Sequence, residues 1–239
     1  MLSSLSESAV IFWLCWLMIV AGAASAILLL LGTRAMYGRY SVQSALMIPP
    51  KLAWFIQELP SFAIPLCYII GCRSLPGIVV LVAFLIHYFN RTFVYPFQLK
   101  SGSGTPWYIC LLGVLFCVWN GYIQVCALVQ LNSGILIFAS GMFINITSDG
   151  ILRSLRRPGE TGYRIPRGGL FEYVSGANFF GEIVEWTGFA IMSQSLPAFA
   201  FVFFTACNVG PRAIHHHQWY LNRFPNYPKD RKALIPFML

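Results

Sequence analysis

The most informative shortage in this sequence of 239 residues is charge, because only 10% of its residues are charged while 57% are hydrophobic. Soluble domains carry about 25% charged residues, so this chain cannot cover a water-facing surface. The composition excludes an ordinary soluble domain and predicts an integral membrane protein. The formal net charge of +8 is therefore interpreted first as loop charge that orients the chain in a membrane, and not as a nucleic-acid surface.

Several short motifs are also missing. The seven cysteines include no CxxC pair, so neither a metal site nor a disulfide framework is expected. The sequence contains neither GxGxxG nor a Walker motif, which means that any nucleotide is held by a different device. Three consecutive histidines at 215–217 could suggest a metal, but successive helical residues point about 100° apart and cannot all reach one ion. We predict no metal site.

Long hydrophobic runs, by contrast, are abundant. A helix needs about 20 apolar residues to cross a bilayer. Seven runs approach that length, at 9–32, 52–71, 77–97, 107–130, 134–151, 177–196 and 197–218. The sequence therefore predicts an all-α, seven-transmembrane helical bundle formed by residues 1–239 as a single domain. The first run is too long and too apolar for a signal peptide and follows no basic segment, so we expect a retained span.

Basic residues fall in alternate loops. The loops and tail on one predicted side carry Arg34, Arg39, Lys51, Lys100, Arg153, Arg156, Arg157, Arg164, Arg167, Arg223, Lys229, Arg231 and Lys232. On the other side the connections hold only Arg73. Lysine and arginine are concentrated in cytoplasmic loops of membrane proteins. This pattern predicts a lumenal or exterior N-terminus and a cytosolic C-terminus.

Polar side chains interrupt five of the predicted spans, always in the half nearer the cytosol. They are Gln57, Glu58, His87, Tyr88, Arg91, Tyr95, Asn145, Asp149, Asn178, Glu182, Glu185 and Arg212. Ionisable residues inside a membrane are costly and indicate function, so we predict one cavity open to the cytosol. The simpler alternative is a set of interhelical hydrogen bonds. A transporter would continue polar residues into the lumenal half, which looks almost purely apolar.

Four segments carry a resemblance to a known family. "WFIQELPSF" (54–62), "HYFNRTFVY" (87–95), "NITSDGILRSLRRPGETGYRIPRGGLFEYVSGANFFGEIVEW" (145–186) and "RAIHHHQWYLNRFPNYPKDRKALIPF" (212–237) resemble the steroid 5α-reductases, the 3-oxo-5α-steroid 4-dehydrogenases. The resemblance extends from about residue 51 to the end and fits both the type 1 and the type 2 isozyme.

The resemblance implies a seven-span enzyme of the endoplasmic reticulum membrane. Family members use NADPH to reduce the Δ4 double bond of 3-oxo-steroids such as testosterone and progesterone. It also implies a steroid that enters from the lipid, with no nucleic acid and no obligate protein partner. A related membrane reductase that acts on enoyl-CoA, polyprenol or another sterol remains the alternative.

The resemblance also implies roles for individual residues. Glu58 and Tyr88 match the catalytic pair that binds the steroid 3-keto oxygen, and Trp54, Gln57 and Trp186 match the steroid site. The positions that match NADPH-binding residues are Asn145, Asp149, Arg156, Tyr163, Asn178, Glu182, Arg212, His216 and Tyr220. Lys100 stands where the family tends to carry arginine, and we expect it near the phosphates.

The implied reaction places specific demands on this pair. Negative charge develops on the 3-oxygen during reduction, and preorganised donors in a dry site stabilise such charge best. A tyrosine hydroxyl at Tyr88 and a protonated Glu58 would serve, since burial favours the neutral carboxylic acid. Glu185 is expected to be a binding or structural group, either paired with Arg212 or placed beside Trp186 at the steroid end.

Overall fold

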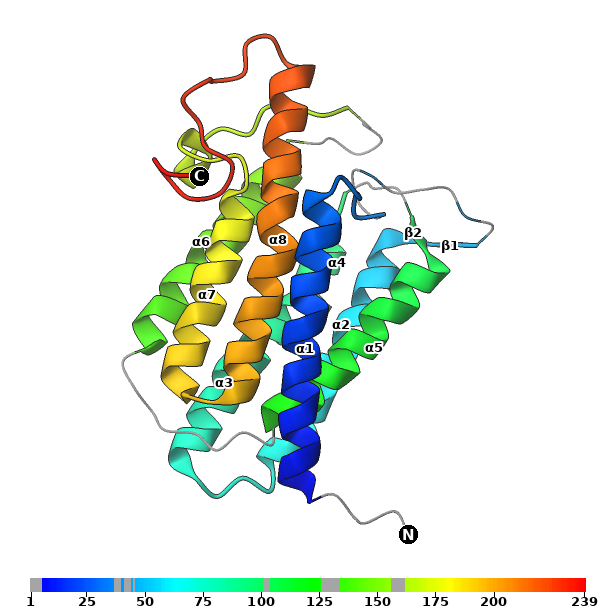
Figure 1. Ribbon diagram of the computed structural model, residues 1–239, viewed down its shortest axis with the longest axis vertical. Helices are drawn as coiled ribbons and strands as arrows, with labels where there is room; N and C mark the ends of the chain where they lie inside the picture. The colour runs from blue at the N-terminus through cyan, green and yellow to red at the C-terminus, as the bar shows by residue number, and fades with distance from the viewer. Residues whose placement is uncertain are drawn as a thin grey trace.

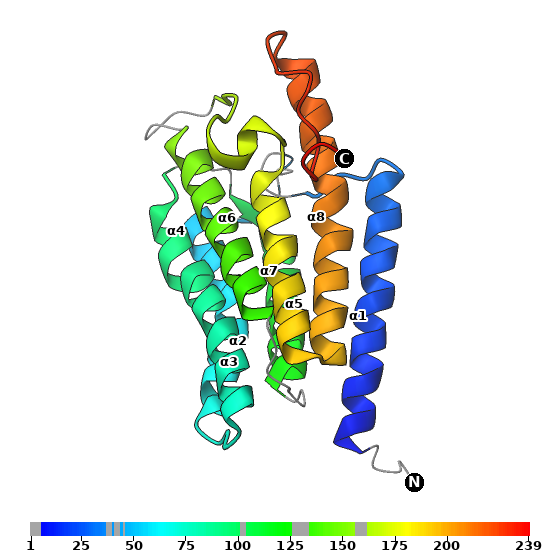
Figure 2. The same ribbon diagram turned by 90° about the vertical axis from the view of Figure 1, so that its left-hand side faces the viewer.

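The computed structural model describes residues 6–36, 40, 44, 46–100, 104–125, 134–155 and 162–239. Helices dominate the described chain (Figures 1 and 2). The long helices are α1 (Glu7–Leu30), α2 (Pro50–Ile69), α3 (Leu75–Phe89), α5 (Trp107–Val125), α6 (Gly134–Ser154), α7 (Ala177–Ser193) and α8 (Leu196–Arg223). The short elements are the π-helix η2 (Asn90–Val94), α4 (Tyr95–Gln98), the 3-10 helix η3 (Gly169–Glu172) and the antiparallel strands β1 (Met47–Ile48) and β2 (Thr105–Pro106).

The long helices lie side by side and traverse the bundle in alternating directions, so that the start of α1 and the C-terminus lie at opposite ends (Figure 1). Among the described residues, five helical stretches are long and apolar enough to cross a membrane: α1, α2, α3 continued through α4, α5 and α6. The expected all-helical, multi-pass architecture is therefore confirmed. The count of seven spans and the orientation remain predictions: α7, with 17 residues, is shorter than these five stretches, and α8, although it has 28 residues, is not among them.

The observed helix ends differ from the predicted ones where the chain carries specific end signals. The predicted span 177–196 ends at Ser193, because Gln194 adopts a left-handed conformation with φ 49° and the Ser195 side chain accepts a hydrogen bond from Ala198 N at the start of α8. α8 continues past residue 218 to Arg223 and rises above the neighbouring helices (Figure 2).

Glycine allows α6 and α7 to pack unusually closely. A Cβ atom added to Gly141 of α6 would fall on the backbone of Glu185, and one added to Gly188 of α7 would fall on the backbone of Phe138. Small residues at helix interfaces let backbones approach in membrane proteins. As a result, polar residues of these two helices face each other at short range near the end of the bundle that holds the C-terminus.

An aromatic cluster fills the centre of the bundle. The Trp186 ring of α7 lies 5.8 Å from the ring of Phe84 on α3 and 4.5 Å from that of Phe201 on α8. Phe84 also packs 4.6 Å from Tyr88. These contacts fix the rotation of α3, and with it the direction in which Tyr88 points.

The half of the bundle that was predicted to be lumenal is not as apolar as the sequence pattern suggested. Asn120 and Gln124 are both buried and lie in the C-terminal part of α5. Both side chains make hydrogen bonds with protein groups. The Asn120 amide and the Gln124 NH₂ group are thus bonded within the bundle, whereas Gln124 Oε1 is buried without a hydrogen-bond partner.

The C-terminal residues fold back over the polar end of the bundle. Ser175 N donates a 2.9 Å hydrogen bond to Lys232 O, and Gly176 N donates one of 2.9 Å to Ala233 O. Arg231 is buried and donates to Pro166 O at 2.9 Å. The tail thereby fixes the segment that leads into α7.

Candidate active site

A cavity of about 660 Å³ opens between the helices, a volume typical of small-molecule sites. The predicted site residues in the described part of the chain all line it: Trp54, Gln57, Glu58, Tyr88, Lys100, Asn145, Asp149, Tyr163, Asn178, Glu182, Trp186, Arg212, His216 and Tyr220. Arg156 lies outside the described residues. The structure thus brings together side chains from five long helices and the connecting segments, while their individual roles remain predictions.

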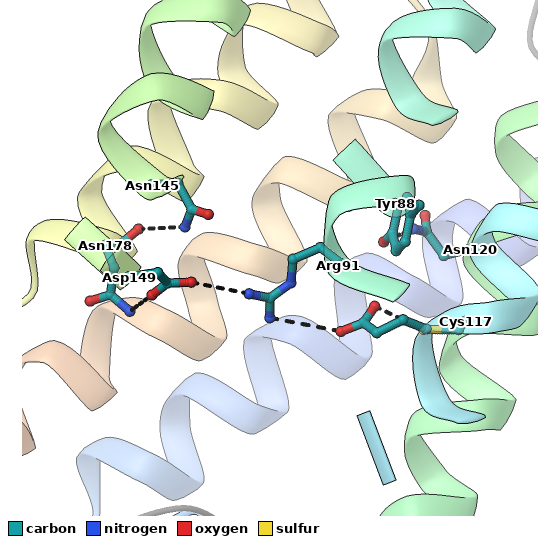
Figure 3. Close-up of polar contacts among 8 residues, drawn as sticks. Tyr88, Arg91, Cys117, Asn120, Asn145, Asp149 and Asn178 are labelled. Carbon is teal, nitrogen blue, oxygen red and sulfur yellow. Dashed lines mark hydrogen bonds and ion pairs between the residues drawn. The ribbon is translucent and has the colours of Figure 1, made fainter. Parts of the chain in front are cut away.

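Arg91 connects two acidic residues that line this cavity, Asp149 and Glu58 (Figure 3). Its Nη1 atom donates a 3.4 Å hydrogen bond to Asp149 Oδ2, and its Nη2 atom lies 3.8 Å from Glu58 Oε1. The guanidinium group also lies over the rings of Trp54 at 4.4 Å and Tyr95 at 4.7 Å. Sequence reasoning placed Arg91 in the polar layer but not among the site residues, although an arginine inside a span was a sufficient signal.

The backbone around Arg91 is a π-helical segment, Asn90–Val94, between α3 and α4. Such insertions are frequent at functional sites because they change the rotation of one part of a helix relative to the next. Here Tyr88 precedes the segment and Tyr95 follows it, and both line the cavity with Arg91. No feature of the sequence indicated this segment.

Glu58 and Tyr88 project from α2 and α3 onto the same cavity wall. The hydroxyl oxygen of Tyr88 accepts a 3.1 Å hydrogen bond from Asn120 Nδ2, and Glu58 Oε2 lies 3.8 Å from the thiol of Cys117 (Figure 3). Sequence reasoning missed Asn120 and Cys117. Each sits in an apolar run of the sequence, which reveals neither the partner nor the direction of the side chain.

The nearby Arg91 guanidinium changes the electrostatic setting expected for Glu58. The positive guanidinium lies 3.8 Å from Glu58 Oε1 and attracts this carboxyl group when it is ionised. Arg91, however, makes its shorter contact and its hydrogen bond with Asp149. Glu58 is therefore the more weakly paired of the two acids.

Glu185 has a different partner from the one expected. Its Oε1 atom lies 2.7 Å from Nδ1 of His87, rather than pairing with Arg212, and its side chain is fully buried. The His87 ring packs 4.4 Å from the Trp186 ring. Glu185 thus connects α7 to α3 behind the cavity wall, which supports its expected structural role.

The half of the cavity nearer the C-terminus is polar and rich in cations. Asn145 Nδ2 donates a 3.0 Å hydrogen bond to Asn178 O, and Asn178 Nδ2 donates one of 3.2 Å to Asp149 Oδ1. The cationic lining residues that the structure describes are Arg91, Lys100, Arg153, Arg164 and Arg212, against the acids Glu58, Asp149 and Glu182. This set suits an anionic ligand with hydroxyl groups, since cations neutralise phosphates while amides and carboxylates bond hydroxyls.

The other half of the cavity is apolar and aromatic. Its lining includes Leu112, Phe116, Trp186 and Phe201. A rigid hydrophobic molecule fits such a wall.

Within the described ranges, no group of three or more His, Cys, Asp or Glu residues is placed to hold a metal ion. His216 lines the cavity, whereas Nδ1 of His217 lies 2.6 Å from Ser175 Oγ.

Comparison with known proteins gives consistent matches over most of the chain. A family model described as 3-oxo-5-alpha-steroid 4-dehydrogenase matches residues 103–239. The Mus musculus protein named 3-oxo-5-alpha-steroid 4-dehydrogenase 1 is 50% identical over 222 residues, covering 85% of this chain and 87% of the relative. The Homo sapiens protein named 3-oxo-5-alpha-steroid 4-dehydrogenase 2 is 48% identical over 244 residues, covering 90% of this chain and 95% of the relative.

Proposed function

The chain belongs to the 3-oxo-5-alpha-steroid 4-dehydrogenase family, and from this premise we propose that it reduces the Δ4 double bond of a 3-oxo-steroid with NADPH. The chain is accordingly an oxidoreductase. The observation that carries the proposal is that Glu58 and Tyr88 line one cavity with an apolar aromatic half and a polar cationic half. Such a cavity fits a steroid and an anionic dinucleotide together.

The proposed site for NADPH is the polar half. Arg212, Lys100 and, in the segment outside the described residues, Arg156 would offset the phosphate charges. The amides of Asn145 and Asn178, with Asp149 and Glu182, would bond ribose hydroxyls and the carboxamide. Tyr163, His216 and Tyr220 line the same region and would contact the rest of the molecule. When bound, NADPH supplies the hydride that adds to steroid C5.

The proposed role of Tyr88 and Glu58 is to bind the 3-keto oxygen and stabilise the negative charge that forms on it. Both side chains are positioned before the reaction by neighbouring helices, so little reorganisation accompanies the charge development. Tyr88 donates its hydroxyl proton as a hydrogen bond. We propose that Glu58 donates in its protonated form, while Arg91 makes its shorter contact and its hydrogen bond with Asp149.

The steroid itself would bind against Trp54, Gln57 and Trp186, with the aromatic half of the cavity around its rings. A steroid partitions into lipid, and we propose that it enters from the bilayer. The setting that fits this substrate is the endoplasmic reticulum membrane, with seven spans, a lumenal N-terminus and the polar half of the cavity toward cytosolic NADPH. The basic loops at the end of the bundle that holds the C-terminus support this orientation.

A direct assay tests the proposal. Microsomes that contain the protein are incubated with NADPH and labelled testosterone, and the products are separated and scored for dihydrotestosterone. We expect reduction that depends on NADPH and is absent from microsomes without the protein. Failure to reduce any of several Δ4-3-oxo-steroids would overturn the proposed substrate.

A further inference from the structure

A buried chain of hydrogen bonds connects Tyr88 to the first turn of α8. Gln124 Nε2 donates to Pro197 O at 3.0 Å and to Asn120 Oδ1 at 3.1 Å. Asn120 Nδ2 in turn donates to the Tyr88 hydroxyl oxygen at 3.1 Å. The chain thus runs from the far end of the bundle toward the cavity and joins α8, α5 and α3.

The donor and the acceptor in each hydrogen bond follow from the first bond of the chain, between Gln124 and Pro197. The Pro197 carbonyl can only accept, so Gln124 must turn its NH₂ group toward it. The same NH₂ group also lies next to Asn120. Because an NH₂ group can only donate, it must face the amide oxygen of Asn120. This leaves Asn120 with its own NH₂ group against Tyr88. The chain consequently admits one orientation of Asn120, in which Tyr88 is the acceptor.

The orientation of Asn120 determines where the Tyr88 proton points. A phenol oxygen that accepts from Asn120 directs its own proton elsewhere. Tyr88 lines the cavity, so its proton, directed away from Asn120, is available to an acceptor that binds there.

We propose that Asn120 is a positioning residue for the reduction, acting through Tyr88, and that Gln124 sets its orientation. Asn120 is fully buried and lies beside Tyr88 but does not line the cavity (Figure 3). Its donated hydrogen bond directs the phenol proton toward the ketone. It also stabilises the negative charge that the phenol oxygen gains as it donates. The inference rests on the proposed role of Tyr88 as a donor to a 3-keto oxygen.

A double-mutant cycle tests this action through Tyr88. Leucine is larger than asparagine but has the same branching at Cγ, so the substitution removes the amide and keeps the outline of the side chain. We expect Asn120→Leu to lower kcat for Δ4-3-oxo-steroid reduction about tenfold or more, with a smaller change in KM. In a Tyr88→Phe background the same substitution should change kcat by less than about twofold, because its effect requires the hydroxyl. Equal losses in both backgrounds would overturn the proposal.

A second variant covers the possibility that Asn120→Leu does not fold. Gln124→Leu leaves Asn120 in place but removes the group that orients it, so we expect a loss of about threefold to tenfold in kcat. Gln98→Leu, at an exposed position of α4 that does not line the cavity, is the matched control and should retain full activity. Full activity in Gln124→Leu would contradict the orienting role.

A readout without turnover separates this inference from the proposed function. A saturated 3-oxo-steroid labelled with ¹³C at the ketone reports hydrogen bonding through its carbonyl stretching frequency. In the unsubstituted protein we expect a shift to lower frequency on binding, and in Asn120→Leu a smaller shift. An equal shift in both proteins would reject the role of Asn120 while leaving the proposed function intact. Absence of any shift in the unsubstituted protein would reject the role of Tyr88 and this inference with it.

Discussion

Arg91 donates a 3.4 Å hydrogen bond to Asp149, and this bond ties the π-helical segment that follows Tyr88 to α6. The same guanidinium lies 3.8 Å from Glu58 on α2. Glu58 of the proposed catalytic pair and Asp149 of the proposed NADPH site therefore share one cation. A change in either acid alters the electrostatic setting of the other.

This sharing predicts that Arg91→Lys impairs the enzyme although it keeps the charge. Lysine offers a point charge in place of a planar fork and cannot stack between Trp54 and Tyr95 in the same way. We expect the kcat/KM for steroid reduction to fall at least about tenfold. Arg73→Lys, at an exposed loop position, is the control and should behave like the unsubstituted protein. Unchanged kinetics in Arg91→Lys would show that the bridge is dispensable.

The proposed donors predict a separation between turnover and cofactor binding. Tyr88→Phe and Glu58→Gln should each lower kcat by about 10²-fold, the usual cost of losing a donor to a developing oxyanion. Binding of NADPH, followed by fluorescence, should change little because these side chains face the steroid. Tyr173→Phe and Glu7→Gln are exposed controls of the same chemistry. Near-normal turnover in either active-site variant would remove that residue from the proposed pair.

The close approach of α6 and α7 predicts a large difference between two alanine substitutions in one helix. Gly141→Ala would place a methyl group on the backbone of Glu185, whereas a Cβ at Gly150 lies 3.8 Å from an Arg153 side-chain atom, an ordinary contact. Overpacking costs about 1–3 kcal/mol, so the Gly141→Ala protein should lose several degrees of thermal stability in detergent. Gly150→Ala should be as stable as the parent or slightly more so. Equal midpoints would mean that the helices can separate freely.

The docking of the C-terminal tail predicts a stability change in mild acid. The pKa of Glu172 is lowered from the usual 4.5, first by the Gly168 N–H group and then by Arg231 and Arg167. A lowered folded-state pKa contributes stability that is present above about pH 4.5 and is lost as the pH falls through the lower value. The contribution is small because the side chain is 44% exposed.

The variant Glu172→Gln isolates this contribution. Its thermal midpoint should fall below that of the parent at pH 6, and the gap should narrow as the pH approaches 4. The measurement is a pair of melting curves at each pH in the same detergent. A gap that is constant with pH would indicate that the effect of Glu172 is not electrostatic.

The sequence predicted the helices and many of the residues that line the cavity, because both can be recognised from short stretches of sequence. Apolar runs mark helices directly, and the family motifs carry Glu58, Tyr88 and Asn178 with their spacing. It could not predict pairings that depend on how three helices rotate against one another. The bridge from Arg91 to Glu58 and Asp149 is one case, and the contact of Glu185 with His87 is another.

The amides of α5 illustrate the same limit. Asn120 sits in an apolar run, and its spacing gives no indication that it meets Tyr88 across a helix interface. The predicted number of membrane spans depends on a different property, the length and hydropathy of each helix. α7 and α8 pack with the other helices, yet neither is among the five stretches that are long and apolar enough to span a membrane, although α8 is 28 residues long.

The most direct test of the proposed reaction follows an isotope from cofactor to product. Membranes containing the protein are incubated with testosterone and NADPH that carries two deuterium atoms at C4 of the nicotinamide, and the product is examined by mass spectrometry and NMR. We predict dihydrotestosterone with one deuterium at C5, formed far more slowly by Tyr88→Phe. Absence of reduced product, or reduced product without deuterium, would contradict NADPH-dependent reduction of the Δ4 bond by this chain.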